Sequence, residues 1–577
     1  MAQAVQQRGQ QQPRSSGGTV DVQLLSLPNQ RNINAWDALD NSKDAIIKNA
    51  VVSLFQDPIS QSYNIAIAKR AGWDSGSDIT GTATDLGDMI SDDGILSTHS
   101  DSGGTTYEAY YNSTLLGTIA GPGDSIQRMQ LEGVTNYVIN TGSDVYYLKD
   151  DTDVVSGTKT FTASFPSGGT TLSSVSSISG LVPGQLLSGT GITSGTRIST
   201  ITDSTTLIVD TATSASGAGV TIMREAISKV LSPPSGTPKG HIVEMDGFVF
   251  MLTSTNGGTI YHSAVDDIQS WPSTNLIQPN IRPDSGVTLF RYKNLVGCFG
   301  IESCEFFYNA GNPTGSILER MAQAFIGFGA DTFPSKGQSV AYQGDNVFWY
   351  SYKSGNRPGI YTMEGLQPKR ISNTYLDNIL IRTTPHLSFF TYNGQNYLGV
   401  FPFSAATGFH GALYHIDALG IWTLVGMPYD MMLSSGGFGK QLRGVRTQTG
   451  AGKRYLLDDG NLTGSTPVYT DLGSSYSMSI QTTKMNFGSG NLKSIEYIEL
   501  IADTQSSGTM TLEYSTDDYA NWTTLGTFDL TAHVKRIYFV PAFAGEVAFR
   551  LTHSAATPCR IFALKVRPIS VSGLGAH

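Results

Sequence analysis

The sequence predicts an all-β protein built around a β-propeller, and two observations support this. The first is composition: the 577 residues include 64 glycines, and charged residues make up only 15%. Sparse charge with abundant Gly, Ser and Thr is typical of strands joined by many turns, whereas helical bundles need long segments rich in Ala, Glu, Lys and Leu. The second is a unit of short strands and tight turns that recurs at intervals of roughly forty to sixty residues, as propeller blades do.

The recurring unit is marked by hairpin turns between apolar runs. They fall at Asp246-Gly247, Lys293-Asn294, Gly344-Asp345-Asn346 and Asn393-Gly394. Asn-Gly and Asp-Gly in this setting are the strongest short-range hairpin signals. Two units close on a tryptophan, Trp271 and Trp422. We predict six blades.

Residues 344–373 contain most of one blade. A glycine turn is followed by an aromatic run, a turn at Arg357-Pro358-Gly359, a strand at Ile360–Met363 and a turn at Glu364-Gly365. We expect the aromatic side chains of such units to pack between neighbouring blades.

Two segments break the pattern. Residues 157–223 are dense in Ser, Thr and Gly, with strand patterns at 196–201 and 206–210, and contain only four charges, Lys159, Arg197, Asp203 and Asp210. We predict a small β-domain inserted in a propeller loop, because loop tips tolerate insertions. Residues from about 475 to 570 contain longer alternating strands, which indicate an antiparallel sandwich or a last large blade.

These patterns divide the chain into five parts. The predicted parts are an N-terminal arm (1–24), the first part of the propeller (25–156), the inserted domain (157–223), the remaining blades (224–474) and a C-terminal β-rich region that closes the propeller or forms a sandwich (475–577). The arm is rich in Gln, Gly and Ser and would be disordered alone. Short strands are expected at Ala50–Phe55 and Tyr63–Ala68.

Charge and cysteine content exclude several classes of protein. The net charge of -10 argues against a general nucleic-acid binder, which needs clustered Lys and Arg. Three cysteines, Cys298, Cys304 and Cys559, do not form a disulfide framework and favour assembly in a reducing cytoplasm. No apolar N-terminal segment and no run of membrane-spanning length occurs, so we expect neither a signal peptide nor a membrane span.

Nucleotide and metal motifs are weak. The segment Gly450–Arg454, "GAGKR", resembles a phosphate loop, but it lacks the first Gly of that motif at the right spacing and the Ser or Thr after the Lys. A basic turn is therefore the better interpretation. His410 and His415 are the closest histidine pair, but a metal site needs three or four ligands. Cys298 and Cys304 lie in one hairpin and are expected to be core thiols.

Paired carboxylates do not indicate catalysis either. Asp266 and Asp267, or Asp458 and Asp459, are adjacent in sequence and would point to opposite faces of a strand. We interpret them as solvated turn residues. The sequence therefore predicts no catalytic, cofactor-binding or metal-binding residue, no cofactor and no enzyme activity.

One motif resembles the Asp-box of sialidase-type propellers. In "YSTDDYANW" Ser515, Asp517 and Trp522 fit the box, whereas Tyr519 replaces Gly and Asn521 replaces Thr. In those proteins the box is a folding turn between two strands and is not catalytic. A sialidase would also need an arginine triad and a Tyr/Glu pair, which the sequence does not identify.

Three segments carry a resemblance to a known family: "RNINAW", "YNIAIAKRAGW" and "VFWYSYKSGNRPGIYTMEGLQPKRIS". The chain resembles the tail nozzle proteins, or packaged-DNA stabilisation proteins, of short-tailed bacteriophages. The family's early Lys-Arg-x-Gly turn is matched by Lys69, Arg70 and Gly72. Its blade motif is matched by Gly359, Ile360, Tyr361, Gly365, Ile371 and Ser372. The inserted segment resembles small β-modules of phage tail and fibre proteins.

The resemblance implies a structural component of a short tail, assembled in the host cytoplasm and located in the virion. It implies a homohexameric nozzle ring below the head-to-tail adaptor that retains packaged DNA and provides the channel for its ejection. The implied partners are other copies of the chain, the adaptor protein, tail fibres or tailspikes, a tail needle or plug, and double-stranded DNA passing without sequence-specific binding. An acidic subunit would give a lumen that repels DNA.

Two alternatives stay open at this stage. The Asp-box remnant would suit a carbohydrate-binding or carbohydrate-active propeller, which as a glycosidase requires a facing pair of carboxylates and a sugar-sized pocket. The insert would suit a tail-fibre or receptor-binding module, but fibres typically trimerise through long β-helical or coiled-coil segments, which the sequence lacks.

Overall fold

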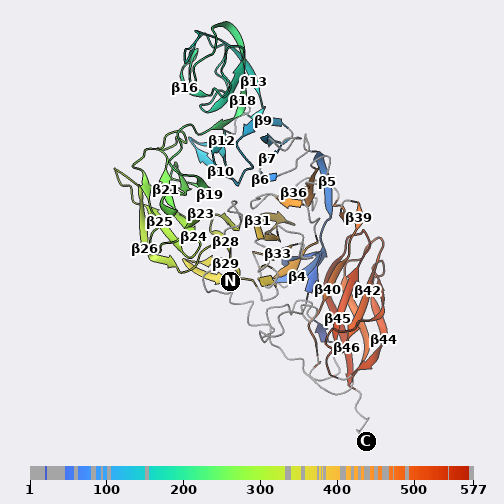
Figure 1. Cartoon of the computed structure of the whole chain (residues 1–577). Helices are drawn as coiled ribbons and strands as arrows, with labels where there is room; N and C mark the ends of the chain where they lie inside the picture. The colour runs from blue at the N-terminus through green and yellow to red at the C-terminus, as the bar shows by residue number, and fades with distance from the viewer. Residues whose placement is uncertain are drawn as a thin grey trace.

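The computed structural model describes residues 20–22, 46–56, 63–78, 86–91, 95–100, 106–112, 114–149, 155–331, 339–352, 358–372, 376–377, 380, 385–402, 411–416, 421–426, 431–433, 442–446, 453–457, 467–471, 473–485, 487, 493–543 and 545–570. Within these ranges the named elements are β-strands and one 3-10 turn, Thr255–Gly257. The chain is an all-β protein containing a β-propeller, as predicted (Figure 1). No helix in the described ranges is long and apolar enough to cross a lipid bilayer.

Seven antiparallel sheets with blade topology occur in the described residues. The first blade contains β6 (Leu86–Ser91), β7 (Ile95–Ser100), β8 (Tyr107–Tyr111) and β9 (Thr114–Ile119). The second contains β10 (Ser125–Leu131), β11 (Val134–Asn140), β12 (Val145–Lys149) and the end of β18 (Gly217–Lys229). The third contains β19 (Pro238–Met245), β20 (Phe248–Thr253), β21 (Thr259–His262) and β22 (Leu276–Ile277). The fourth blade contains β23 (Gly286–Tyr292), β24 (Leu295–Gly300), β25 (Cys304–Asn309) and β26 (Leu318–Ile326). The fifth contains β27 (Val340–Gln343), β28 (Asn346–Ser351), β29 (Gly359–Glu364) and β30 (Gln367–Arg370).

The last two blades are joined to distant parts of the chain. The sixth is β31 (Pro385–Tyr392), β32 (Gln395–Pro402), β33 (Ala412–His415) and β34 (Trp422–Leu424). The seventh combines β35 (Met431–Leu433), β36 (Arg443–Arg446) and β37 (Lys453–Leu457) with β5 (Trp73–Asp78) from near the N-terminus. The predicted count of six blades is not confirmed, because the sequence pattern starts after β6 and β7 and cannot show that β5 completes a blade.

The predicted hairpin turns are confirmed. Asp246 and Gly247 have φ of 57° and 78°, and Asn393 and Gly394 have φ of 50° and 69°. Such left-handed pairs match the twist of the strands they join. The turn at Lys293 has the same character, with φ of 55°.

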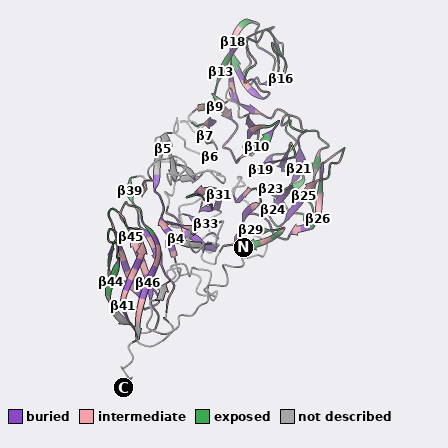
Figure 2. Ribbon diagram, turned by 180° about the vertical axis from the view of Figure 1, so that it is seen from behind, coloured by how far each residue is buried: buried purple, intermediate pink, exposed green. Residues whose placement is uncertain are grey.

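Aromatic side chains pack between neighbouring blades, as predicted. Phe299 of the fourth blade lies 5.1 Å from Trp349 of the fifth, measured between ring centroids. On the opposite face of the fifth blade, Phe348 lies 5.6 Å from Phe389 of the sixth. Figure 2 shows buried residues along the blade strands, and the interfaces of the fifth blade with the fourth and the sixth are both parts of the hydrophobic core.

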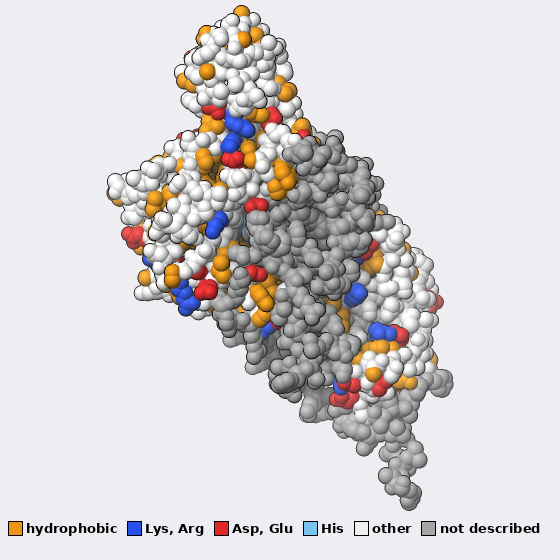
Figure 3. Space-filling view, in the orientation of Figure 1, with side chains coloured by type: hydrophobic (Ala, Val, Ile, Leu, Met, Phe, Trp, Pro, Cys, Tyr) orange, Lys and Arg blue, Asp and Glu red, His pale blue; other side chains and the backbone are white. Residues whose placement is uncertain are grey.

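The inserted segment has a core of its own. Its strands are β13 (Lys159–Phe165), β14 (Thr171–Leu172), β15 (Gln185–Gly189), β16 (Ile198–Asp203), β17 (Thr206–Val209) and the first part of β18. β16 and β17 match the two strands predicted here. The lobe projects from the propeller in Figure 1 and has few charged side chains on the face in Figure 3. β18 is shared, because its end pairs with β12 of the second blade.

The C-terminal strands form a sandwich together with N-terminal strands. One sheet has the order β3 (Ala50–Gln56), β4 (Tyr63–Lys69), β46 (Arg560–Ser570), β41 (Lys493–Ala502) and β44 (Arg536–Phe543), with β1 (Val20–Val22) beside β46. The other has β2 (Ile46–Lys48), β40 (Met478–Gln481), β45 (Ala548–His553), β42 (Thr509–Ser515) and β43 (Thr523–Asp529). β38 (Thr470–Asp471) and β39 (Ser474–Ser475) form a separate hairpin.

The sandwich is continuous with the propeller through one parallel pairing. β2 lies beside β34 of the sixth blade, with Lys48 opposite Leu424. The strands predicted at 50–55 and 63–68 are confirmed as β3 and β4, but they pair in the sandwich and not in a blade. The domain boundaries stay predictions, and this pairing places part of the range 25–156 with the C-terminal strands.

A core substitution in the insert tests whether this lobe is a separate unit. Leu207 is fully buried in the insert core, whereas Ile208, its neighbour in β17, is 38% exposed. Leu207→Ala should cost about 2–5 kcal/mol and raise hydrogen exchange of the insert amides, with the propeller strands unchanged. Ile208→Ala is the matched control and should change little. Loss of protection across the propeller in Leu207→Ala would contradict a separate unit.

Candidate functional site

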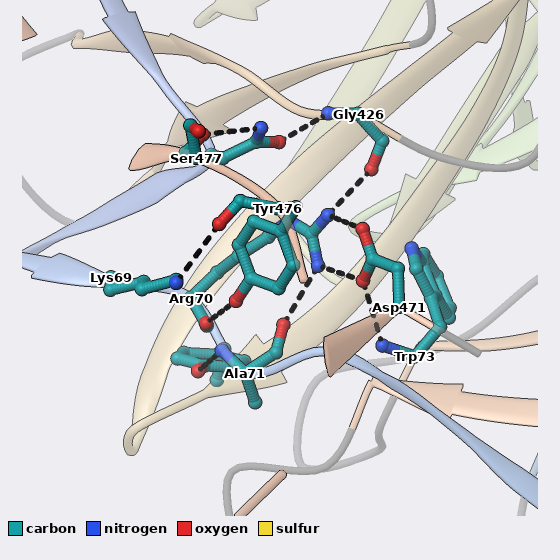
Figure 4. A network of polar contacts seen from close by, with 10 residues as sticks. Lys69, Arg70, Ala71, Trp73, Gly426, Asp471, Tyr476 and Ser477 are labelled. Carbon is teal, nitrogen blue, oxygen red and sulfur yellow. Dashed lines mark hydrogen bonds and ion pairs between the residues drawn. The ribbon is translucent and has the colours of Figure 1, made fainter. Parts of the chain in front are cut away.

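The segment Lys69–Gly72 lies where the chain leaves the sandwich and enters the propeller. β4 of the sandwich ends at Lys69, and β5 of the seventh blade begins at Trp73. Figure 4 shows the polar network around this segment. The network joins the sandwich to the propeller, and it contains the Lys-Arg-x-Gly turn noted in the sequence.

Arg70 forms a buried clamp at this junction. Its side chain is fully buried, and its Nη1 and Nη2 atoms donate to Asp471 Oδ1 and Oδ2 at 2.8 and 2.5 Å. Nη1 also donates to the Ala71 carbonyl at 2.8 Å, and Nη2 donates to the Gly426 carbonyl at 2.9 Å. A bidentate guanidinium–carboxylate pair is among the strongest hydrogen-bonded contacts in proteins. The clamp therefore joins the end of β4, the loop after β34 and β38.

Tyr476 covers the clamp. Its ring centroid lies 4.1 Å from Arg70 Cζ, and its hydroxyl donates to the Arg70 carbonyl. The Trp73 backbone N–H donates to Asp471 at 3.1 Å, and the Ala71 N–H donates to the Tyr392 hydroxyl of β31 at 2.7 Å. These bonds fix the chain on both sides of Arg70 against the propeller.

Lys69 contacts the sandwich side. Its Nζ donates to the carbonyls of Tyr476 and Ala555 at 3.0 and 2.6 Å and lies 4.4 Å from the Tyr476 ring centroid. Burial is the main cause that lowers the pKa of Lys69 to about 8, and repulsion from the Arg70 charge is the second. Carbonyl oxygens and the ring thus satisfy this ammonium.

Gly72 is required by close packing. A Cβ at this position would lie 1.9 Å from the Thr470 carbonyl oxygen. The Gly72 N–H donates to the Val468 carbonyl at 2.6 Å. The Lys-Arg-x-Gly turn noted in the sequence therefore has a physical explanation: Lys69 binds the sandwich, Arg70 binds Asp471 and the sixth blade, and Gly72 lets β38 approach.

The blade motif is also explained by packing. A Cβ at Gly359 would lie 2.7 Å from Ser372 Oγ, which accepts a hydrogen bond from Ile360 N at 2.9 Å and donates to Asp377. Trp422 of the sixth blade donates to the Ile371 carbonyl at 2.9 Å. The motif therefore closes its own blade and attaches it to the next.

The predicted core thiols are buried. Cys298 and Cys304 are free cysteines on neighbouring strands β24 and β25, and burial raises the pKa of both thiols. Cys559 is also free and buried. His415 is buried, and its Nε2 lies 2.6 Å from Gln395 Oε1. His410 lies outside the described residues.

The carboxylate and basic-turn predictions have mixed outcomes. Asp266 and Asp267 are exposed turn residues, as expected, and accept backbone hydrogen bonds from Glu132 and Gln269. Asp458 and Asp459 lie outside the described residues. The predicted basic turn is wrong for Lys453 and Arg454, because both belong to β37. Across the described ranges, no three His, Cys, Asp or Glu side chains come together to hold a metal ion.

The Asp-box remnant forms a turn between β42 and β43. Asp517 accepts hydrogen bonds from Ser515 Oγ at 2.8 Å and from Asn521 N and Nδ2 at 3.0 and 2.6 Å, which lower the pKa of Asp517 to about 2. Tyr519, in the glycine position, has φ of 67°. The turn forms despite both departures from the motif.

Sequence reasoning missed a polar cluster at the propeller axis. The first strands of successive blades contact one another around this axis, in the order β6, β10, β19, β23, β27 and β31. Tyr342 of β27 donates to Gln127 of β10 at 3.0 Å, so this hydrogen bond joins blades that are not neighbours. Side chains therefore cross the axis of the propeller. No sequence signal could indicate this cluster, because its side chains point toward the axis only once the blades have closed into a ring.

A β-bulge places His241 in the same cluster. The register of β19 shifts between Lys239 and Val243, and the Gly240 carbonyl accepts hydrogen bonds from Ser125 and Asn140. The His241 ring lies 5.4 Å from the Tyr342 ring and is almost fully buried. Burial and the nearby His386 lower the pKa of His241 to about 4 from 6.5.

The clamp predicts a large local loss of stability when Arg70 is removed. Arg70→Met leaves Asp471 without its partner and should lower the free energy of local unfolding by about 3–5 kcal/mol, measured by hydrogen exchange of β4 and β5. Arg560→Met, which removes an exposed pair with Asp503, is the control and should have little effect. Equal effects of the two variants would argue against the clamp.

The axial histidine predicts acid sensitivity. The unfolded chain binds a proton at His241 below about pH 6.5, whereas the folded chain resists protonation until about pH 4. Stability is therefore fully present above pH 6.5 and falls by on the order of 3 kcal/mol toward pH 4.

Denaturant midpoints measured across this pH range should fall less steeply in His241→Gln. The exposed His533→Gln is the control and should keep the wild-type slope. An unchanged slope in His241→Gln would show that the buried imidazole does not cause the effect.

Comparisons with known structures give weak overall likeness. The streptogramin B lyase structure matches with a TM-score of 0.34 at 10% identity, covering 68% of this chain and 98% of that chain. The N-terminal domain of Nup159 matches with a TM-score of 0.31 at 8% identity, covering 71% and 98%. The β-propeller domain of the Trilobed protease from Pyrococcus furiosus matches with a TM-score of 0.27 at 10% identity, covering 66% and 98%. No curated protein matches the sequence.

A family model identifies the propeller more specifically. Residues 168–388 match the phage stabilisation family, described as "Bacteriophage P22 Gp10, beta-propeller". The matched range runs from the insert through the third, fourth and fifth blades into β31. Over residues 168–388 the chain is therefore similar to the phage stabilisation propeller family.

Proposed function

We propose that the chain is the subunit of a nozzle ring at the end of a short bacteriophage tail. The observation that carries this proposal is the match of residues 168–388 to the P22 Gp10 propeller. In the proposed ring six copies surround one channel, retain the packaged DNA and let it leave on ejection. A head-to-tail ring of this kind closes by symmetry and buries the same interface six times.

The geometry supports a channel between subunits. The Tyr342–Gln127 hydrogen bond and the buried His241 occupy the axis of the individual propeller. A DNA duplex would therefore pass along the axis of the ring and not through a propeller. The net charge of -10 favours a lumen that does not retain phosphate.

The junction at Arg70 supports a mechanical role. Its bidentate ion pair and the parallel pairing of β2 with β34 couple the sandwich to the propeller. A rigid subunit suits a component that bears the pressure of packaged DNA. We propose a structural, non-catalytic protein of the virion tail, assembled in the host cytoplasm, whose partners are the adaptor, a needle or plug, and fibres or tailspikes.

Mass photometry with negative-stain images tests this function. We expect a six-fold ring, either from the protein alone or only when portal and adaptor complexes are added. The proposal is wrong if the chain stays monomeric in the presence of those complexes. Cleavage of glycans by such a monomer would favour a carbohydrate-active propeller.

A further inference from the structure

The outer face of the sandwich sheet β46-β41-β44 carries an ordered row of large side chains. Arg567, Tyr497 and Tyr538 are register partners on these three strands. The alternate positions Ile498 and Leu500 of β41 are buried in the sandwich core. Because successive side chains of a strand point to opposite faces, the row faces away from the core.

A second row lies beside the first. Glu499 is the register partner of Arg536 on β44 and of Lys565 on β46. Arg536 Cζ lies 4.7 Å from the Tyr497 ring centroid, and Arg536 Nη2 lies 3.2 Å from Glu499 Oε2. Hydrogen bonds to Tyr538 and Glu499 raise the pKa of the Arg536 guanidinium. Stacking on Tyr497 and the ion pair with Glu499 thus hold the Arg536 side chain in place.

The first row is also held in place. Arg567 Nε lies 3.0 Å from Glu496 Oε2, and Arg567 Cζ lies 6.0 Å from the Tyr497 ring centroid. The Tyr497 and Tyr538 rings lie 6.1 Å apart and are tilted by 60°. We call the set Tyr497, Tyr538, Arg536, Arg567, Glu496 and Glu499 the tyrosine platform. Its side chains are pre-ordered, so a ligand would lose little free energy to their immobilisation.

The platform is open to solvent and has two arginines paired with two glutamates, and Lys565 of the second row adds one positive charge beside Glu499. Tyr538 is 53% exposed, among the most exposed large apolar side chains in the described residues. Arg567 and Glu496 have exposed side-chain fractions of 43% and 45%. Each guanidinium is offset by a carboxylate. In Figure 3 the sandwich surface likewise shows basic, acidic and hydrophobic side chains next to one another.

We propose that the tyrosine platform binds a neutral oligosaccharide. The C–H face of a pyranose carries weak positive charge and packs on the negative face of an aromatic ring such as that of Tyr538. The guanidinium fork of Arg536 and the carboxylate of Glu499 supply donors and acceptors for neighbouring hydroxyls.

Charge balance selects this ligand over a polyanion. Binding of DNA phosphates depends on cations that have no local counter-charge, and the platform arginines are each paired with a glutamate. The site goes beyond the proposed nozzle function, because it lies within one chain and needs no ring.

Binding of the full-length protein to immobilised cello-, malto- and chito-oligosaccharides, with a DNA duplex on the same array, tests the proposal. We expect one or more of these neutral sugars to bind, and Tyr538→Ala to weaken binding about tenfold or more. Tyr352→Ala is the matched control, because Tyr352 is 44% exposed and belongs to the propeller. It should bind as the wild type does.

A second variant separates recognition from folding. Arg536→Lys keeps the charge but removes the planar fork, so it should also weaken sugar binding while the thermal unfolding midpoint stays unchanged. The proposal fails if none of the sugars binds, or if Tyr538→Ala binds as the wild type does. Binding of the duplex alone, with steep salt dependence, would make the face a phosphate-binding surface and also overturn it. These results do not depend on whether the chain forms rings.

Discussion

The structure depends on a buried guanidinium at the point where its two parts meet. Burying Arg70 without partners would cost several kcal/mol, so the chain supplies a carboxylate 401 residues away and a carbonyl from the sixth blade. The Tyr476 ring and hydroxyl complete the site. Because these partners come from distant segments, the clamp can form only when the propeller and the sandwich are both in place.

The course of the chain explains why such a clamp is needed. The N-terminal strands β2, β3 and β4 belong to the sandwich, and β5 completes the seventh blade. β5 is the last strand of the sheet order β35-β36-β37-β5, so segments from both ends of the propeller sequence meet in one blade. The segment Lys69–Gly72 connects β4 of the sandwich to β5 of the seventh blade, and Gly72 permits the close approach of Thr470. Local stiffness at this turn is therefore a condition for both parts of the fold.

The sequence predicted local features better than long-range ones. The turns at Asp246 and Asn393 and the five long C-terminal strands follow from residue types at fixed spacing. The seventh blade, the N-terminal strands of the sandwich and the Arg70–Asp471 pair depend on contacts between segments hundreds of residues apart. The Lys-Arg-x-Gly turn was visible as a motif, but its partners were not. His241 was unremarkable in sequence because a bulge in β19 directs it to the axis.

We propose that each propeller is a closed wall element of the ring and that DNA passes between subunits. A cryo-EM map of an assembled particle with its DNA packaged tests this most directly. We expect DNA density on the axis of a six-fold ring and protein density alone on each propeller axis, where Tyr342 contacts Gln127. DNA density within a propeller, or absence of this chain from the tail, would contradict it.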